Sequence, residues 1–339
     1  MEHTIIGVDI SKNVFSIHGK HARGKAVFCK KASRGDFLSV LENYPGSVVA
    51  METCGGANHW GRELQQRGFE VRLLAPRHVK PYVRSQKNDY ADAEAIAEAA
   101  SRERVRVVPV KDITQQDLQT LHRLREHLVK QITAQVNMLR GLLMEYGIVM
   151  PQGIRHFRNR FCETLESNES NLTRPIYGVF KAMFESYRML EEQLDTYTSQ
   201  LEQIAKNHPV AKRLMTIPGI GPITATALLT INISGCKNGR NLGAMLGLVP
   251  SQYSTGGKER LGRITKRGNK YLRKILVQGA RAVLVNCHRH QTAYFTKAYD
   301  LKKRLGYNKA AVAMANRNTR IAYRILTTDE MVFRDTVLN

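Results

Sequence analysis

The sequence predicts an α/β domain followed by an all-α region, and two patterns support this division. Short apolar or alternating runs, typical of β-strands, are interleaved with helical segments through the first hundred residues. From residue 113 onward, apolar residues recur at steps of three and four, as on one face of a helix. A chain of 339 residues is long enough for two or three domains. We expect three parts, over residues 1–112, 113–210 and 211–339.

The predicted order along the first part is strands over 4–9, 14–20 and 25–32, a helix over 36–44, a strand over 47–52, a helix over 60–66 and a strand over 69–75. The first three strands are separated by short turns and fit an antiparallel meander. Later strands alternate with helices. This order predicts a mixed sheet covered by helices.

Four acidic residues of this part form a candidate metal site. Asp9 and Glu52 each end an apolar strand, and Asp89 and Asp92 lie three residues apart near a helix start. That spacing places the pair on one helical face, about 5–6 Å apart at Cβ. Acids at a helix N-terminus also complement the helix dipole and need no other role. Because two Mg²⁺ ions that serve phosphoryl transfer require oxygen ligands of this kind, we expect a two-metal site.

The segments GVDISK, METCGGANHW and KNDYADAEAIAEA, with this strand order, resemble the RNase H-like, RuvC-type domain of the DEDD insertion-sequence transposases. That family includes the Piv invertase and the bridge-RNA-guided recombinases. The resemblance implies an RNase H-like fold for residues 1–112. It also implies that Asp9, Glu52, Asp89 and Asp92 are catalytic residues and metal ligands.

Two long helices are predicted in the middle part. Apolar residues at steps of three and four run through 115–145 and, without interruption, through 176–206. This spacing predicts a coiled-coil seam, formed within an antiparallel hairpin or between subunits, although an ordinary bundle core fits equally well. Between the helices we expect a basic, irregular stretch over 153–171.

The segment LMTIPGIGPITATALL, residues 214–229, predicts a helix, a tight turn and a second helix. It resembles a helix-hairpin-helix, in which glycines let backbone N–H groups approach a nucleic-acid phosphate. Gly219 and Gly221 are therefore candidate nucleic-acid contacts. The alternative is a plain turn between two core helices.

The chain is strongly basic, with 52 Lys and Arg against 29 Asp and Glu and a net charge of +23. Such a balance is typical of proteins that bind a polyanion, although a merely basic surface has the same composition. Residues 235–339 alone carry +16, against +5 for 1–112 and +2 for 113–234. The candidate nucleic-acid contacts of this region are Lys258, Arg260, Arg263, Lys266, Arg267, Lys270, Arg273 and Lys274.

A candidate nucleophile precedes these cations. Ser254 lies in YSTGGK, and a serine among cations can attack phosphorus once its proton is removed. The same residues are also ordinary turn sequence. The segment GLVPSQYSTGGKERLGRITKRGNKYLRKIL resembles the C-terminal transposase domain of the same family, which carries a catalytic serine in this motif. The resemblance assigns that role to Ser254, with Thr255 and Ser251 as neighbouring alternatives.

The resemblance implies a DNA transposase or recombinase that uses Mg²⁺ and a covalent phosphoserine intermediate. It further implies three kinds of partner: DNA ends and target, a structured guide RNA from the element, and further copies of the chain in a dimer or tetramer. The location implied is the bacterial cytoplasm, at the nucleoid. The sequence itself argues against a membrane or secreted protein, since it has no apolar run of about 18 residues, no signal pattern and only scattered cysteines.

Three other functions use the same residues differently. A RuvC-like, metal-dependent junction endonuclease would use the four acids with water as the nucleophile. GVDISK is also similar to the first phosphate loop of actin-like ATPases and sugar kinases, but Ser11 and Lys12 stand where that loop normally has glycine. A nucleic-acid-binding protein without activity would need only the basic surface. The serine and the acids can combine within one chain or across a subunit interface.

Overall fold

The computed structural model describes residues 4–21, 24–83 and 88–335. The chain divides into two compact units, Met1–Gln116 with Asn232–Lys237, and Asp117–Ile231 with Asn238–Asn339. Each unit is described by itself. Lys87, the first residue of the KNDYADAEAIAEA motif, lies outside the described residues. Over the described ranges, no helix is both long enough and apolar enough to cross a bilayer.

The first unit is built on a six-stranded mixed sheet with the order β3-β2-β1-β4-β5-β6. β1 is antiparallel to β2 and parallel to β4, and β4 is parallel to β5. This confirms the predicted mixed sheet. The strands are β1 (Thr4–Asp9), β2 (Val14–His21), β3 (Ala26–Ser33), β4 (Val48–Glu52), β5 (Glu70–Leu74) and β6 (Val107–Val108). β6 was not predicted, because two residues are too few to show alternation.

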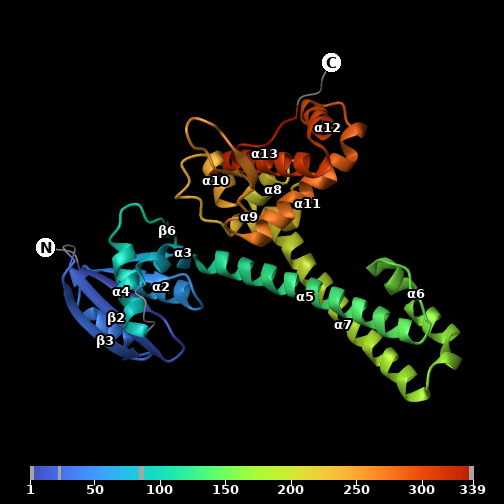
Figure 1. Cartoon of the computed structure of the whole chain (residues 1–339), viewed down its shortest axis with the longest axis horizontal. Helices are drawn as coiled ribbons and strands as arrows, with labels where there is room; N and C mark the ends of the chain where they lie inside the picture. The colour runs from blue at the N-terminus through green and yellow to red at the C-terminus, as the bar shows by residue number, and fades with distance from the viewer. Residues whose placement is uncertain (1–3, 22–23, 84–87, 336–339) are drawn as a thin grey trace. The chain divides into compact units, whose positions relative to one another are not determined.

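Helices cover both faces of this sheet (Figure 1). On one face, α1 (Phe37–Glu42) and α2 (Ala57–Gln66) enclose a core in which Phe15, Phe37 and Trp60 meet edge to face. On the other face lies α4 (Asp89–Ala100), whose buried side is mostly alanine. Small side chains let this helix approach the strands closely. The short helices α3 (Pro76–Val79) and η1 (Lys80–Tyr82) follow β5.

Two long helices, α5 (Ile113–Glu145) and α7 (Arg174–Asn207), run antiparallel within one chain. Two polar residues of α5 join the helices. Arg125 Nε donates to Thr198 Oγ1 at 2.9 Å, and Gln135 Nε2 donates to the Met183 carbonyl at 2.8 Å. The structure thus places the predicted pair of helices in an intrachain hairpin.

The prediction of an irregular stretch over 153–171 is wrong. It holds a 14-residue helix, α6 (Ile154–Ser167), and a short turn, η2 (Glu169–Asn171). Phe157, Phe161 and Leu165 are spaced four residues apart, so they form one buried stripe of α6. The stripe packs against α7, where the Phe161 and Phe184 rings stack at 4.6 Å. The basic residues between these positions obscured the apolar period.

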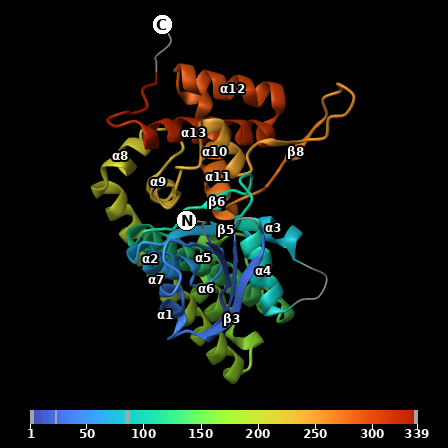
Figure 2. The same cartoon turned by 90° about the vertical axis from the view of Figure 1, so that its left-hand side faces the viewer.

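The rest of the second unit is helical except for one hairpin, which extends away from the helices (Figure 2). Its core forms where α11 and α10 pack against α13, whose Ala311, Met314 and Ala315 are fully buried. The elements are α8 (Pro209–Leu214), α9 (Pro222–Leu229), α10 (Gly239–Met245), β7 (Pro250–Gln252), β8 (Leu261–Ile264), α11 (Lys270–Asn286), η3 (Cys287–Arg289), α12 (Ala293–Leu305) and α13 (Tyr307–Thr327).

Candidate active site

Strand alternation aims Asp9 and Glu52 at the same face of the sheet. In β1, Ile6 and Val8 point into the α1/α2 core, so Ile5, Gly7 and Asp9 point toward α4. In β4, Val48 and Ala50 lie in the α4 core, and Glu52 continues that series. Val8 pairs with Met51 in the parallel register, which brings the two strand ends together. Both carboxylates therefore emerge from neighbouring strands beneath α4.

Gly7 brings α4 to these strands. A Cβ at this position would lie 2.2 Å from the Ala93 carbonyl oxygen and 2.5 Å from the Ala97 nitrogen, so only glycine admits the helix backbone here. The helix begins after Asn88, whose side chain accepts from the Ala91 nitrogen at 2.8 Å. Asp89 and Asp92 lie in the first turn.

The four predicted carboxylates come within electrostatic reach of one another. Burial raises the pKa of Asp9, and the charges of Asp92 and Asp89 raise it further. Burial likewise raises the pKa of Glu52, with added contributions from Asp9 and Asp92. Like charges that are gathered in this way favour binding of a cation.

Two residues that were not predicted adjoin the acids. Lys31 Nζ of β3 lies 3.5 Å from Asp89 Oδ2, and burial together with Asp9 and Glu52 raises the pKa of the Cys54 thiol. Cys54 was detectable by its place two residues after Glu52. Nothing in the sequence indicates a role for Lys31, because only the folding of the sheet brings it close to Asp89.

Ser254 lies in the second unit, on the exposed hairpin between β7 and β8. Gly256 and Gly257, with φ of 58° and 74°, make the turn, and Thr255 pairs with Lys258 across it. The Ser254 hydroxyl oxygen accepts from Gln252 Nε2 at 3.0 Å and from the Arg260 nitrogen at 3.4 Å. Within the described residues its own hydrogen has no acceptor.

The hydroxyl of the nearby Ser251, unlike that of Ser254, donates a hydrogen bond. Its hydroxyl donates to the Arg263 carbonyl at 3.1 Å and so holds β7 against β8. A Cβ at Gly262 would lie 2.6 Å from that hydroxyl oxygen, which shows how closely the hairpin strands enclose it. Of the two hydroxyls, only that of Ser254 lacks an acceptor for its hydrogen among the described residues.

The predicted nucleic-acid cations divide into two groups. Arg273 donates to the carbonyls of Leu246 and Arg267 at 3.0 and 2.8 Å, and Lys274 pairs with Glu126 at 3.0 Å, so both hold the fold together. The other cations have no ion pair or side-chain hydrogen bond within the described ranges: Lys258, Arg260, Arg263, Lys266, Arg267 and Lys270. This second group remains available to a phosphate backbone.

The two predicted turn glycines also differ. Gly219 has a φ of 86°, and a Cβ there would lie 2.6 Å from the Gly279 carbonyl oxygen of α11. Close packing of this turn against α11 therefore explains why residue 219 is glycine. Gly221 is exposed at the start of α9, with open space beside it.

Similarity to known proteins identifies the family to which the chain belongs. A DEDD transposase model of the IS110 type matches residues 6–148, and a model described as the transposase IS116/IS110/IS902 family matches residues 211–296. The chain is 40% identical over 330 residues to the transposase for insertion sequence element IS1111A of Coxiella burnetii, covering 96% of this chain and 90% of that protein. The chain belongs to the IS110 family of insertion-sequence transposases.

Other relatives agree over the same span. A probable family 20 transposase of Pseudomonas aeruginosa is 39% identical to this IS110-family transposase, covering 96% of this chain and 97% of that protein. The transposase for insertion sequence element IS1328 of Yersinia enterocolitica is 38% identical, with 97% and 98% covered. The first matched region includes the four acids, and the second includes Ser254.

Proposed function

We propose that this IS110-family transposase exchanges DNA strands between the ends of its insertion sequence and a target through a serine-linked intermediate. The observation that supports this most strongly is the convergence of Asp9 and Glu52 with Asp89 and Asp92 under the start of α4. Carboxylates within electrostatic reach of one another, two of them with raised pKa values, are unfavourable without a cation.

A DEDD transposase domain is expected to depend on divalent metal, and the chemistry of these ligands suits Mg²⁺. Asp9, Glu52, Asp89 and Asp92 would hold the ions, which supply charge stabilisation at the scissile phosphate and the leaving oxygen. Among the residues that the structure describes, no three acidic, imidazole or thiol groups are close enough together to enclose an ion. Metal binding therefore requires rotation of exposed side chains, of which Asp89 is one.

Ser254 acts as the nucleophile in this proposal. Its Oγ forms a bond to phosphorus while the bond from phosphorus to one deoxyribose oxygen breaks, and the hydroxyl proton passes through solvent to that leaving oxygen. The donors from Gln252 and Arg260 stabilise the developing negative charge on Oγ. A second DNA end then attacks the phosphoserine and releases the serine. Because the phosphodiester energy is conserved in the intermediate, no ATP is needed.

The unpaired cations between Lys258 and Lys270 would hold the DNA strands. In this proposal a structured guide RNA from the element selects donor and target, and a dimer or tetramer brings two DNA ends together. The net charge of +16 over residues 235–339 supports contacts to a nucleic-acid backbone.

A water-based endonuclease of the RuvC type is the second candidate. It is favoured by the placement of all four acids in a unit that does not contain Ser254. Trapping of a covalent protein–DNA adduct distinguishes the two candidate functions. Wild-type protein incubated with element-end DNA and Mg²⁺ should give a DNA adduct whose tryptic peptide contains Ser254. Ser254→Ala should give none, whereas cleavage by Ser254→Ala at the wild-type rate would establish the water mechanism.

A further inference from the structure

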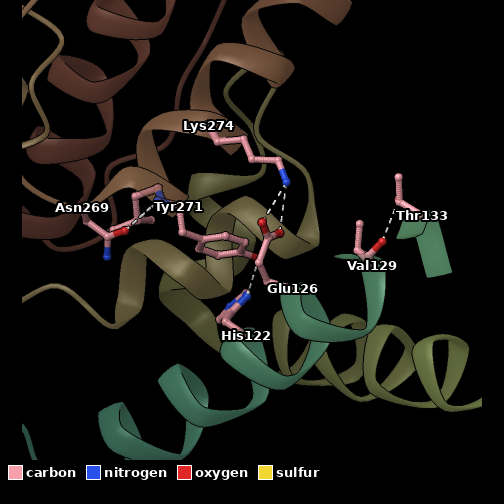
Figure 3. Close-up of polar contacts among 8 residues, drawn as sticks. His122, Glu126, Val129, Thr133, Asn269, Tyr271 and Lys274 are labelled. Atoms are coloured by element: carbon pink, nitrogen blue, oxygen red, sulfur yellow. Dashed lines mark hydrogen bonds and ion pairs between the residues drawn. The ribbon is translucent and has the colours of Figure 1, made fainter. Parts of the chain in front are cut away.

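A cavity of about 520 Å³ lies within the second unit, between α5 and the start of α11. Figure 3 shows Tyr271 reaching from α11 toward His122 of α5, with Glu126 and Lys274 beside them. The wall on the α9 side is formed by Ala227 and Thr230. A cavity of this size is far larger than a phosphate ion needs and is within the range that holds a nucleotide.

The base of this cavity is fixed by a chain of hydrogen bonds. Thr226 Oγ1 donates its only hydrogen to the Pro222 carbonyl at 2.8 Å, so it can only accept from His122 Nε2 at 3.1 Å. The protonated nitrogen of His122 is therefore Nε2. Its Nδ1 accepts from the Tyr271 hydroxyl at 3.0 Å, which locks the phenol ring in place.

His122 and the pair of Glu126 and Lys274 together add no net charge to the cavity. His122 is 3% exposed, and burial together with Arg125 lowers its pKa to about 4, so the imidazole is neutral at physiological pH. The Glu126 carboxylate is neutralised by Lys274, whose Nζ lies 3.0 and 3.1 Å from its two oxygens. A neutral, partly aromatic interior suits a nucleobase rather than a phosphate.

Cations occupy the rim. Arg123, His127 and Lys130 line the cavity from α5, are exposed, and form no ion pair within the described ranges. Their spacing of four and three residues puts them on one helical face. Two amides that line the same cavity have no hydrogen-bond partner in the part of the chain that the structure describes. They are the Gln119 side chain and the Nδ2 of Asn269, whose Oδ1 caps α11.

We infer that this cavity receives one unpaired nucleotide of a nucleic-acid strand. The base enters against Tyr271 and is hydrogen-bonded by Gln119 and Asn269, while the flanking phosphates lie on Arg123 and Lys130. This site is separate from the Ser254 hairpin. The inference rests on the proposed function for the presence of a nucleic acid, but binding here requires no cleavage chemistry.

Photocrosslinking tests the inference directly. The full chain would be irradiated with an oligonucleotide of about 12 residues that carries one 4-thiothymidine, or with its RNA counterpart carrying 4-thiouridine. Mass spectrometry should locate crosslinks within residues 119–130 or 269–272. A crosslink to DNA alone, to RNA alone or to both supports the site and identifies which nucleic acid enters it. Crosslinks confined to residues outside these two segments overturn the inference.

Variants test the rim and the cavity separately. Arg123→Gln with Lys130→Gln should lower the slope of log affinity against log salt by about 1.4, since two phosphate contacts to a single strand are lost. The control removes two exposed cations of α7, Lys181→Gln with Lys206→Gln. Equal slopes for the two double variants overturn the rim assignment.

Gln119→Trp should narrow the cavity and remove the crosslink within residues 269–272, whereas Gln131→Trp, on an exposed position of the same helix, should retain it. Retention in both variants overturns base insertion. Unchanged melting temperatures establish that the variants fold. Because crosslinking needs no strand exchange, failure of Ser254 as nucleophile would leave these outcomes unaffected.

Discussion

The two candidate halves of the active centre are built in opposite ways. The acids of the first unit project from the ends of packed strands and from a helix that contacts the sheet through Gly7. Ser254 lies on an exposed hairpin turn, where one side chain and one backbone nitrogen contact its hydroxyl. The acid site is fixed by a hydrophobic core, whereas the serine is held by polar contacts at the surface.

This difference separates stability from activity. Buried like charges oppose folding, so the acid site should reduce the stability of its own unit while it is required for activity. The serine has almost no buried contact to lose. Substitutions at the two places should therefore have similar effects on strand exchange and different effects on unfolding.

The largest effect is expected for Ser254→Ala, because no neighbouring group replaces a lost nucleophile. Strand exchange should fall by at least about 10³-fold, and the free energy of unfolding should change by less than about 0.5 kcal/mol. Joining of labelled element ends and urea denaturation measure the two quantities. Thr255→Ala is the matched control and should retain most activity; an equal loss there would move the nucleophile by one residue.

Asp9→Asn should also lower strand exchange by about 10³-fold, but it should stabilise the first unit. The folded-state pKa of Asp9 is raised, so its ionised form costs free energy that increases as the pH rises through that pKa. At neutral pH, removing the charge should raise the free energy of unfolding by about 1 kcal/mol, after screening by solvent is considered.

Glu103→Gln, at an exposed acid of the same unit, is the control and should change neither quantity. Mg²⁺ provides a second measurement. At about 100 times its dissociation constant it should stabilise the wild type by about 2.7 kcal/mol and Asp9→Asn by much less. Equal stabilisation of both proteins would place the metal elsewhere.

Much of the acid site was predictable from the sequence because each of its parts has a local cause. Apolar runs mark the strands, and a carboxylate at the end of each run can be identified directly. The role of Gly7 was not predictable, since a glycine in a strand shows neither which helix crosses it nor how closely. Lys31 was missed for the same reason: its neighbour Asp89 is 58 residues away in sequence.

The second unit was less predictable. The helix α6 was missed because its stripe of Phe157, Phe161 and Leu165 is short and surrounded by basic residues. The predicted cations included Arg273 and Lys274, whose partners are the carbonyls of Leu246 and Arg267 and the carboxylate of Glu126. The pair of His122 and Tyr271 is separated by 149 residues, and no local pattern connects them.

His122 and the acid site should respond to pH with opposite sign. His122 has a pKa of about 4 in the folded state against 6.5 as its ordinary value, so the unfolded chain binds its proton first. The stability that the neutral imidazole contributes is therefore lost as pH falls from 6.5 to 4, by on the order of 3 kcal/mol. The raised pKa values of Asp9 and Glu52 act in the other direction.

Urea midpoints measured between these pH values should fall less steeply with acid in His122→Gln than in the wild type. The control is His127→Gln, an exposed histidine of the same helix, which should keep the wild-type slope. An unchanged slope in His122→Gln would show that this imidazole does not remain neutral in the folded chain.

A substitution at Gly7 tests the contact that assembles the acid site. Gly7→Ala adds a methyl group that would lie 2.2 Å from the Ala93 carbonyl, so α4 must shift away from β1. We expect a loss of about 2 kcal/mol from the free energy of unfolding. Strand exchange should also fall, because Asp89 and Asp92 move with the helix. Gly141→Ala, in the interior of α5 with open space beside it, should instead stabilise the second unit by about 0.5–1 kcal/mol. If Gly7→Ala were as harmless as Gly141→Ala, close packing of α4 would not be what gathers the four acids.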